Sequence, residues 1–325
     1  NMINTGEVNA NDIYIGGMIG RLQDTQVVSV KGEIRNEGNV GGNSAMGGIV
    51  GYATDEDAKI PVMAYGDIVN QGKLQGTISS GSASVGGILG SFDCQEGIFS
   101  ETGVIKNEGD ITANGTMVGG IGGYYAVQAS TKPVQKCINT GSVTGTNNVG
   151  GLFGTANLKS STEEYKNIEN SYSTGSVTAS GESQSKVGAL VGYYAGNKIK
   201  NSYHTSPYPI TGTADEANGV ENCYDIEEYR GVAETEEVIS KTKAEFASGE
   251  VAYLLDGTGE KRAEAPVWGQ NIGTDESPVL GGATVYKDGD IYANAEHTYG
   301  DATYKWSDDK KSCCLLYTSP SPRDR

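Results

Sequence analysis

Histidine and cysteine are scarce in this chain of 325 residues, which contains 2 histidines and 5 cysteines. Neither His204 nor His297 belongs to an HExxH motif, which excludes a metalloprotease site of that type from the sequence. The cysteines form no CxxC pair and no even framework, so they indicate neither a zinc site nor a disulfide scaffold. We therefore expect no metal and no cofactor.

Long apolar runs and basic residues are also lacking. No stretch reaches the ~18 apolar residues of a membrane helix, so we expect no membrane insertion within this fragment. The net charge of -17 repels nucleic acid and anionic lipid, which makes nucleic acid an unexpected partner. No signal peptide is visible, but the chain starts at Asn1 inside a repeat, and we expect it to be an incomplete fragment.

Glycine and tyrosine are in excess, with 48 Gly and 19 Tyr against only 4 Phe and 2 Trp. Asn, Thr, Ser, Val and Ile account for much of the remainder. Such a composition favours strands and turns over helices.

Two short motifs alternate along the first two thirds of the chain. The first, polar-x-Gly-x-apolar, begins at Asn4, Asn36, Asn70, Asn107, Asn139 and Ser173. The second, apolar-Gly-Gly-apolar-apolar-Gly with some variation, begins at Ile15, Met46, Val85, Val118, Val149 and Val187. Successive first-motif glycines are 32, 34, 37, 32 and 34 residues apart, a period typical of solenoids.

These fixed motifs with spacers of variable length predict fixed strands joined by variable loops. One repeat cannot bury its own apolar residues, whereas stacked repeats align equivalent residues ~4.8 Å apart in ladders. The sequence therefore predicts an all-β fold, a right-handed β-solenoid (β-helix) of about seven coils over residues 1–230.

Two apolar columns are expected to face the interior. One lies two residues after the first-motif glycine and contains Val8, Val40, Leu74, Ile111, Val143 and Val177. The other lies four residues before that glycine and contains Met2, Ile34, Ile68, Ile105, Cys137 and Ser171. Cys137 replaces an aliphatic residue, which indicates a small buried filler and not a reactive thiol.

The asparagines and glycines of the motifs are expected to shape the corners. Asn and Gly both tolerate positive φ, so the Asn-x-Gly segment suits a corner at which the asparagines could stack in a ladder. The paired glycines predict a close backbone approach or a tight bend. A phosphate-binding loop would need a P-loop lysine and a following helix, and neither is present in the sequence.

The combination of Asn-x-Gly-x-Val with Val-Gly-Gly-Leu/Ile-Val-Gly resembles the bacterial GLUG motif over roughly residues 1–230. The resemblance implies a secreted or cell-wall surface protein, adhesin-like or similar to the non-catalytic part of IgA-specific metallopeptidases. It carries over no catalytic residue. It also implies attachment to the cell wall through regions outside this chain.

Three segments follow the repeats. Residues 231–287 predict a small α+β cap, with a short helix broken at Gly249 and with Trp268 packed inside. Residues 288–313 are expected to begin a further, truncated β module. Residues 314–325 resemble one reading frame of a transposase adaptor used in sequencing libraries, and we expect them not to be native.

Tyrosines that follow the second motif are the candidate ligand-binding residues: Tyr52, Tyr124, Tyr125, Tyr193 and Tyr194. They could bind a glycan or a host surface protein, or they could pack on the solenoid surface. A carbohydrate-active β-helix enzyme would need carboxylates that converge across coils, whereas Asp55, Glu56 and Asp57 are consecutive. We expect no enzyme, but a structural or adhesive repeat region that acts as a stalk or binding surface.

Overall fold

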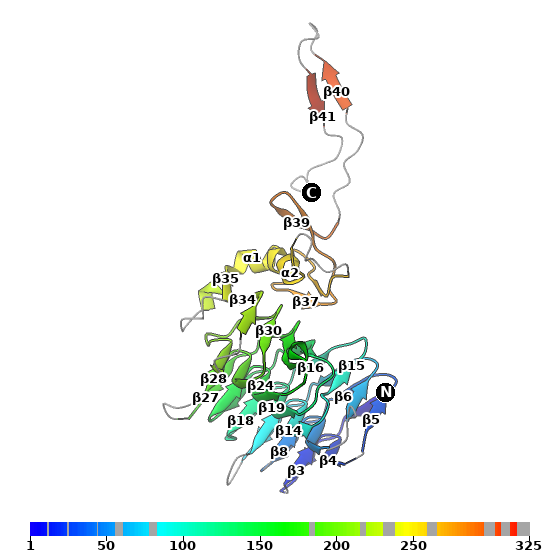
Figure 1. Ribbon diagram of the computed structural model, residues 1–325, viewed down its shortest axis with the longest axis vertical. Coiled ribbons are helices and arrows are strands. Elements are labelled where there is room, and N and C mark those ends of the chain that lie inside the picture. Colours follow the sequence, from blue (N-terminus) through cyan, green and yellow to red (C-terminus); the bar gives the residue numbers. More distant parts are fainter. Residues whose placement is uncertain are drawn as a thin grey trace.

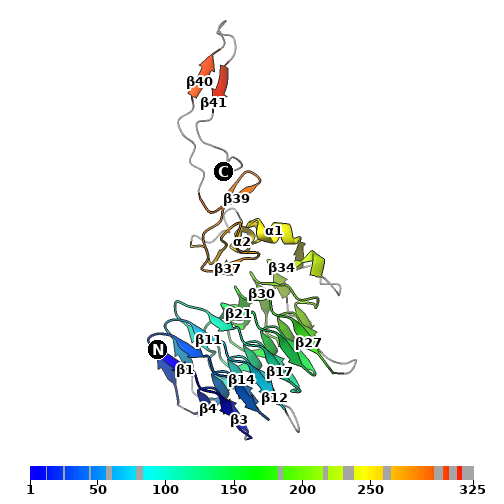
Figure 2. The ribbon, with the colours of Figure 1, turned by 180° about the vertical axis from the view of Figure 1, so that it is seen from behind.

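The computed structural model (Figure 1) describes residues 1–11, 13–24, 26–43, 45–55, 61–77, 83–181, 186–214, 219–229, 238–258, 265–295, 303–306 and 313–316. The repeats form stacked coils, and the C-terminal segments follow at one end of the stack (Figures 1 and 2).

Four parallel sheets form the walls of the stack. Sheet A contains β1 (Met2–Asn4), β6 (Ile34–Asn36), β11 (Ile68–Asn70), β16 (Ile105–Asn107), β21 (Cys137–Asn139), β26 (Tyr172–Ser173), β31 (Tyr203–His204), β34 (Cys223–Ile226) and β35 (Val238–Lys241). Sheet B contains β2 (Val8–Asn9), β7 (Val40–Gly42), β12 (Leu74–Gly76), β17 (Ile111–Ala113), β22 (Val143–Gly145) and β27 (Val177–Ala179). Sheet C contains β3 (Tyr14–Gly16), β8 (Ala45–Gly47), β13 (Ser84–Gly86), β18 (Met117–Gly119), β23 (Asn148–Gly150) and β28 (Val187–Gly188). Sheet D contains β4 (Ile19–Gln23), β9 (Val50–Thr54), β14 (Leu89–Cys94), β19 (Gly122–Val127), β24 (Phe153–Leu158), β29 (Val191–Ala195) and β32 (Thr211–Ala214).

Two short parallel sheets close the coils between sheets D and A. Sheet E contains β5 (Val28–Val30), β10 (Val62–Ala64) and β15 (Phe99–Ser100). Sheet F contains β20 (Val134–Gln135), β25 (Ile168–Glu169), β30 (Lys198–Lys200) and β33 (Gly219–Glu221). A 3₁₀ helix, η1 (Glu163–Lys166), precedes β25, and a second, η2 (Glu227–Tyr229), follows β34.

The β-solenoid is confirmed, but its coil number is smaller than predicted. Sheets B and C each contain six strands, so six coils carry all four walls, and not about seven. The next repeat contributes only to sheets A, D and F through β31, β32 and β33. Its sequence reads Thr205-Ser206-Pro207 where the earlier copies have Thr/Glu/Gln-Gly-x-apolar, and proline cannot donate a hydrogen bond within a sheet.

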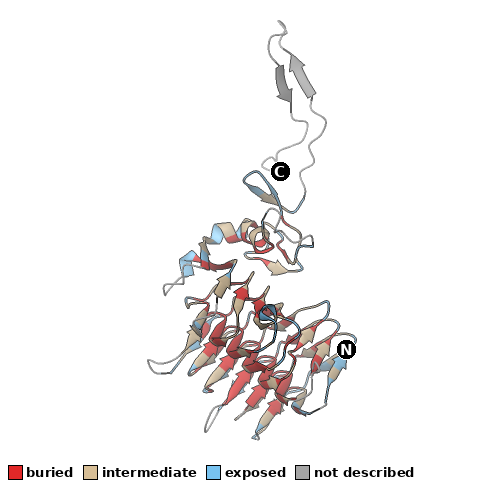
Figure 3. Ribbon diagram, in the orientation of Figure 1, coloured by how far each residue is buried: buried red, intermediate tan, exposed pale blue. Residues whose placement is uncertain are grey.

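The interior is divided into two apolar cores. One lies between sheets B and C and contains the predicted column from Val40 to Val177. The other lies among sheets A, D, E and F and contains the predicted column from Ile34 to Cys137. Both columns are therefore confirmed as inward-facing, with Met2 and Val8 of the first coil partly buried. Buried residues run through the strands of the stack (Figure 3).

A ladder of asparagine side chains separates the two cores. Each Nδ2 donates to the Oδ1 of the next coil, at 2.7 Å from Asn4 to Asn36 and from Asn36 to Asn70, and at 2.8 Å from Asn70 to Asn107 and from Asn107 to Asn139. The same nitrogen donates to the carbonyl oxygen of the glycine two residues on, as from Asn107 to Gly109 at 2.8 Å. At the far end Asn139 Nδ2 donates to Ser173 Oγ at 3.3 Å. We call Asn4, Asn36, Asn70, Asn107 and Asn139 the asparagine ladder.

Glycine is required on both sides of this ladder for space. A Cβ on the second glycine of the Gly-Gly pair would collide with the asparagine opposite, as Gly87 would with Asn107. A Cβ on a corner glycine would collide with the carbonyl oxygen of the corner glycine one coil below, as Gly72 would with Gly38. The predicted close backbone approach is therefore confirmed.

The prediction of positive φ at the Asn-x-Gly corner is wrong. Neither these asparagines nor these glycines have positive φ. Positive φ instead occurs immediately before sheet A, at Lys136, Asn170, Asn201 and Asn222. Asparagine therefore adopts positive φ where the chain turns into sheet A. At the Asn-x-Gly corner, asparagine contributes the hydrogen bonds of its side-chain amide instead.

Cys137 is fully buried in the core between sheets A and D. Burial raises the pKa of its thiol to about 12, although a hydrogen bond to Ser171 opposes this effect. A thiol that stays protonated at neutral pH is a poor nucleophile, so its assignment as a buried filler is confirmed.

The segment after the repeats joins the end of the stack. β35 is the last strand of sheet A, and α1 (Lys243–Ala247) and α2 (Glu250–Leu255) follow it. The predicted break at Gly249 is confirmed, because this residue lies between the helices with φ of 88°. Thr242 and Glu245 form a reciprocal capping box at the start of α1.

Trp268 is a packed residue of the cap, as predicted, with 2% of its surface exposed. Its ring lies 5.8 Å from that of Tyr172 and 5.6 Å from that of Tyr203, on the outward face of sheet A. The cap therefore covers the side of the last coils as well as pairing with the final strand. Its hairpin joins β36 (Trp268–Gly269) to β37 (Val279–Leu280).

Two further antiparallel hairpins end the described chain. One joins β38 (Tyr286–Asp288) to β39 (Ile291–Ala293), and the other joins β40 (Thr303–Trp306) to β41 (Cys313–Leu316). The boundaries expected at residues 287 and 313 stay predictions.

Replacing Asn107 by alanine removes the middle of the asparagine ladder. We expect a loss of about 3 kcal/mol in unfolding free energy, because buried partners on Asn70, Asn139 and Gly109 lose hydrogen bonds. Asn4→Ala is the matched control, since Asn4 is partly exposed at the end of the ladder, and should cost about 1 kcal/mol or less. Urea unfolding measures both, and equal losses would contradict the ladder's role.

Candidate ligand-binding surfaces

The five candidate tyrosines do not form one surface. Tyr125 and Tyr194 are 0% and 1% exposed, so the prediction that they bind ligand at the surface is wrong. In the Tyr-Tyr pairs of β19 and β29, neighbouring residues of one strand point to opposite sides of the sheet. The first tyrosine of each pair faces outward and the second faces the core.

Tyr125 is held inside by its ring and its hydroxyl. The ring lies 5.0 Å from those of Phe92 and Phe153 in the coils on either side. Its Oη accepts a hydrogen bond from the backbone N–H of Ile98 at 3.1 Å. Burial raises the pKa of Tyr125 well above its ordinary value. Tyr194 is similar, with Oη 2.9 Å from the carbonyl oxygen of Lys166 and 3.0 Å from that of Lys198.

Tyr52, Tyr124 and Tyr193 remain as partly exposed residues on the outward face of sheet D, and we call them the tyrosine stripe. The strand register places the following residues in one column along the axis: Arg21, Tyr52, Ser91, Tyr124, Thr155, Tyr193 and Thr213. A tyrosine therefore occurs in every second coil, with a serine or threonine between, at intervals of ~10 Å.

Cations lie against both ends of the stripe. The guanidinium carbon of Arg21 is 5.7 Å from the ring centroid of Tyr52 and 5.4 Å from that of Tyr14, whose ring lies 4.3 Å from Tyr52. Lys186 Nζ lies 4.4 Å from the ring centroid of Tyr193. These distances are in the range of cation–π attraction.

Tyr124 occupies the centre of the stripe. Burial, with the nearby carboxylate of Asp93 as a smaller cause, raises the pKa of its phenol, while a hydrogen bond with the Asn157 side chain lowers it. Asn157 belongs to the next coil, two positions beyond Thr155. This hydrogen bond ties the phenol of Tyr124 to the neighbouring coil, and the tyrosine side chain is partly exposed.

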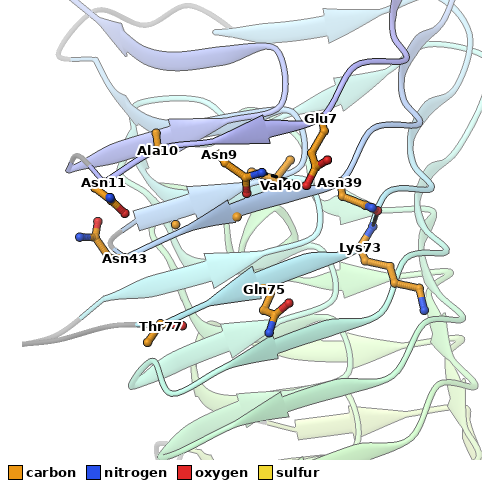
Figure 4. Close-up of a pocket in the computed structure, with 12 residues that line it drawn as sticks. Glu7, Asn9, Ala10, Asn11, Asn39, Val40, Asn43, Lys73, Gln75 and Thr77 are labelled. Atoms are coloured by element: carbon orange, nitrogen blue, oxygen red, sulfur yellow. Dashed lines mark hydrogen bonds between the residues drawn. The ribbon is translucent and has the colours of Figure 1, made fainter.

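A second surface, which the sequence reasoning missed, is a hollow of about 730 Å³ over the outward face of sheet B (Figure 4). The hollow lies over Gly41. The strand register pairs Gly41 with Asn9 in the preceding coil and with Gln75 in the following coil. The lining residues are Glu7, Asn9, Ala10, Asn11, Asn39, Val40, Gly41, Gly42, Asn43, Lys73, Gln75 and Thr77. In the sequence, the one indication of this hollow is that Gly41 stands where the neighbouring repeats have Asn9 and Gln75.

Most polar groups that line this hollow are uncharged amides. Asn9 Nδ2 donates to Glu7 Oε1 at 2.8 Å, and Asn39 Oδ1 accepts from the backbone N–H of Lys73 at 3.0 Å. The arrangement offers hydrogen bonds to a polar ligand, but it has no aromatic ring and only two charged side chains.

Three residues of the types found in a hydrolase triad lie together in the interior of the solenoid. Ser173, His204 and Asp225 occupy consecutive rungs of sheet A beyond the asparagine ladder, and they are 0%, 1% and 3% exposed. His204 Nδ1 lies 3.2 Å from the carbonyl oxygen of Ser206. Substrate could not reach residues that are buried to this degree, so this column is interior packing.

Carboxylates do not define a site within the described residues. Of the three acidic residues at positions 55–57, Asp55 is 5% exposed, and Glu56 and Asp57 lie outside the described residues. In the part of the chain that the structure describes, no three His, Cys, Asp or Glu side chains come together as metal ligands would. Its helices are also too short to span a membrane.

The fold and its surfaces define a repeat-built β-solenoid. A stretch of 136 residues is 30% identical to Halomucin from Haloquadratum walsbyi, an alignment that covers 38% of this chain and 1% of that protein. No family model and no solved structure matches the chain. The fold and this similarity are compatible with a surface repeat region.

Removing single hydroxyl groups tests which tyrosines face the core and which face outward. Tyr125→Phe leaves the buried N–H of Ile98 without its acceptor and should lower the unfolding free energy by about 1–3 kcal/mol. Tyr124→Phe, in the same strand but facing outward, should change it by less than about 0.5 kcal/mol. Chemical unfolding followed by circular dichroism compares the two, and the reverse order would show that the inward and outward assignments are wrong.

Proposed function

We propose that this chain is a non-catalytic, load-bearing repeat segment of a secreted or cell-surface protein, with repeats of GLUG type. The observation that carries the proposal is the continuity of the stack. Sheet A runs through nine strands without a break, and sheets B, C and D run beside it in matching register. Each coil is thus bonded to the next through several strands at once.

The ladder adds side-chain bonds in the same direction as the backbone bonds. Both kinds of hydrogen bond connect one coil to the next, so a coil that leaves the stack loses both, together with its share of the two cores. This cooperativity suits a stalk that holds other parts of a surface protein away from its attachment point.

The proposal extends to the larger protein. The similarity to Halomucin supports a surface location. We propose that regions outside this chain attach it to the cell wall. The non-catalytic scaffold of a larger surface peptidase would use the same load-bearing property, whereas a carbohydrate-active enzyme would require a reactive group on an accessible face.

Single-molecule stretching between residues 1 and 287 tests the mechanical role. We expect a series of force peaks, each releasing roughly 110–120 Å of chain, because one repeat of ~34 residues extends by up to ~3.5 Å per residue. Asn107→Ala should lower the force of the peaks, and Asn4→Ala should have a smaller effect. Extension without force peaks would contradict the load-bearing function.

A further inference from the structure

We propose that the tyrosine stripe binds a linear acidic polysaccharide, which lies along the solenoid axis with one disaccharide for every two coils. The inference goes beyond the load-bearing role and is independent of it. A stalk that fails to bind polysaccharide would still bear load, and unfolding without force peaks would leave polysaccharide binding intact.

The periodicity of the stripe indicates a ligand that itself repeats. Tyr52, Tyr124 and Tyr193 recur every second coil at the same position of the strand, at intervals of ~10 Å. This interval matches the length of two pyranose rings in an extended chain. Ser91 and Thr155 occupy the same position in the intervening coils, where Ser91 is partly exposed and Thr155 is buried.

The chemistry around the rings matches that of a sugar. A pyranose ring has apolar C–H faces that stack on an aromatic ring and polar edges that need hydrogen bonds. In the coil after Tyr124, Asn148 Nδ2 donates to the buried Thr155 Oγ1 at 3.0 Å, and the partly exposed Asn148 amide has a second N–H and an oxygen for further hydrogen bonds. Aromatic rings therefore lie near an amide that can bond the polar edge of a sugar.

Charge complementarity indicates an acidic ligand. The whole chain has a net charge of -17, yet the charged groups that contact the rings of the stripe are the cations Arg21 and Lys186. Each cation lies over a ring at one end of the stripe, where it would pair with the carboxylate of an acidic sugar bound next to that ring. Asp93, a carboxylate, also lies near Tyr124, so the cations mark the two ends of the stripe and not its centre.

The amide-lined hollow on sheet B is a weaker candidate for the same ligand. It has no aromatic ring to stack on a sugar face, and its charged residues, Glu7 and Lys73, have opposite signs. The polysaccharide should therefore bind to sheet D and not to sheet B.

Isothermal titration calorimetry on the full chain with a hyaluronan decasaccharide, which alternates uronic acid and N-acetylhexosamine, tests the proposal. We expect binding that weakens as salt is raised, because the cations of the stripe are accessible to solvent. Tyr124→Ala should weaken binding about tenfold, and Tyr124→Phe, which keeps the ring, should bind like the parent. Lys186→Met should also weaken binding and reduce its salt dependence.

Matched controls lie elsewhere on the surface. Tyr65, which is 58% exposed, and Lys73, whose side chain is 72% exposed beside the hollow, should tolerate Tyr65→Ala and Lys73→Met without loss of binding. Loss of binding in Lys73→Met alone would move the site to sheet B and overturn the proposal. Equal binding of a neutral chitin oligosaccharide would refute the acidic ligand, and no binding of either sugar would refute the site.

Discussion

The hydrogen bond between asparagine side chains of adjacent coils is the interaction on which the rest of the structure depends. Each interior asparagine of the ladder donates two hydrogen bonds and accepts one. Its side chain is therefore bonded to the coil on either side and to the glycine of its own corner. A buried polar side chain of this kind is stable only when its groups are satisfied, and an unbroken stack of identical residues achieves this. The ladder therefore fixes the vertical alignment of the coils.

The same interaction explains the shape of the coil and where the full repeats end. Because the ladder lies against the Gly-Gly strand, the interior narrows there and the apolar residues separate into two cores. Ser173 replaces asparagine in the sixth coil, which is also the last with sheets B and C. In the next repeat, which has no strand in sheets B and C, His204 occupies the position of the asparagine. There the aromatic residues of the cap cover the outward face of sheet A.

The sequence predicted the features that repeat at a fixed spacing. It did not predict the features that depend on which side of a sheet each side chain faces. Two apolar columns and the paired glycines could be located because they recur at fixed spacing, and Gly249 because it interrupts a helical pattern. The register of sheet D was not visible, so Tyr125 was expected beside Tyr124 although the two point in opposite directions. The hollow over Gly41 could not be predicted, because one missing side chain means little until its neighbours in space are known.

Hydrogen exchange of the asparagine side-chain amides, followed by NMR, tests the ladder most directly. In the native protein, the amides of Asn36, Asn70, Asn107 and Asn139 should exchange orders of magnitude more slowly than that of the partly exposed Asn4, because they are fully buried and bonded on both sides. Exchange of all five at the rate of surface asparagines would contradict the account.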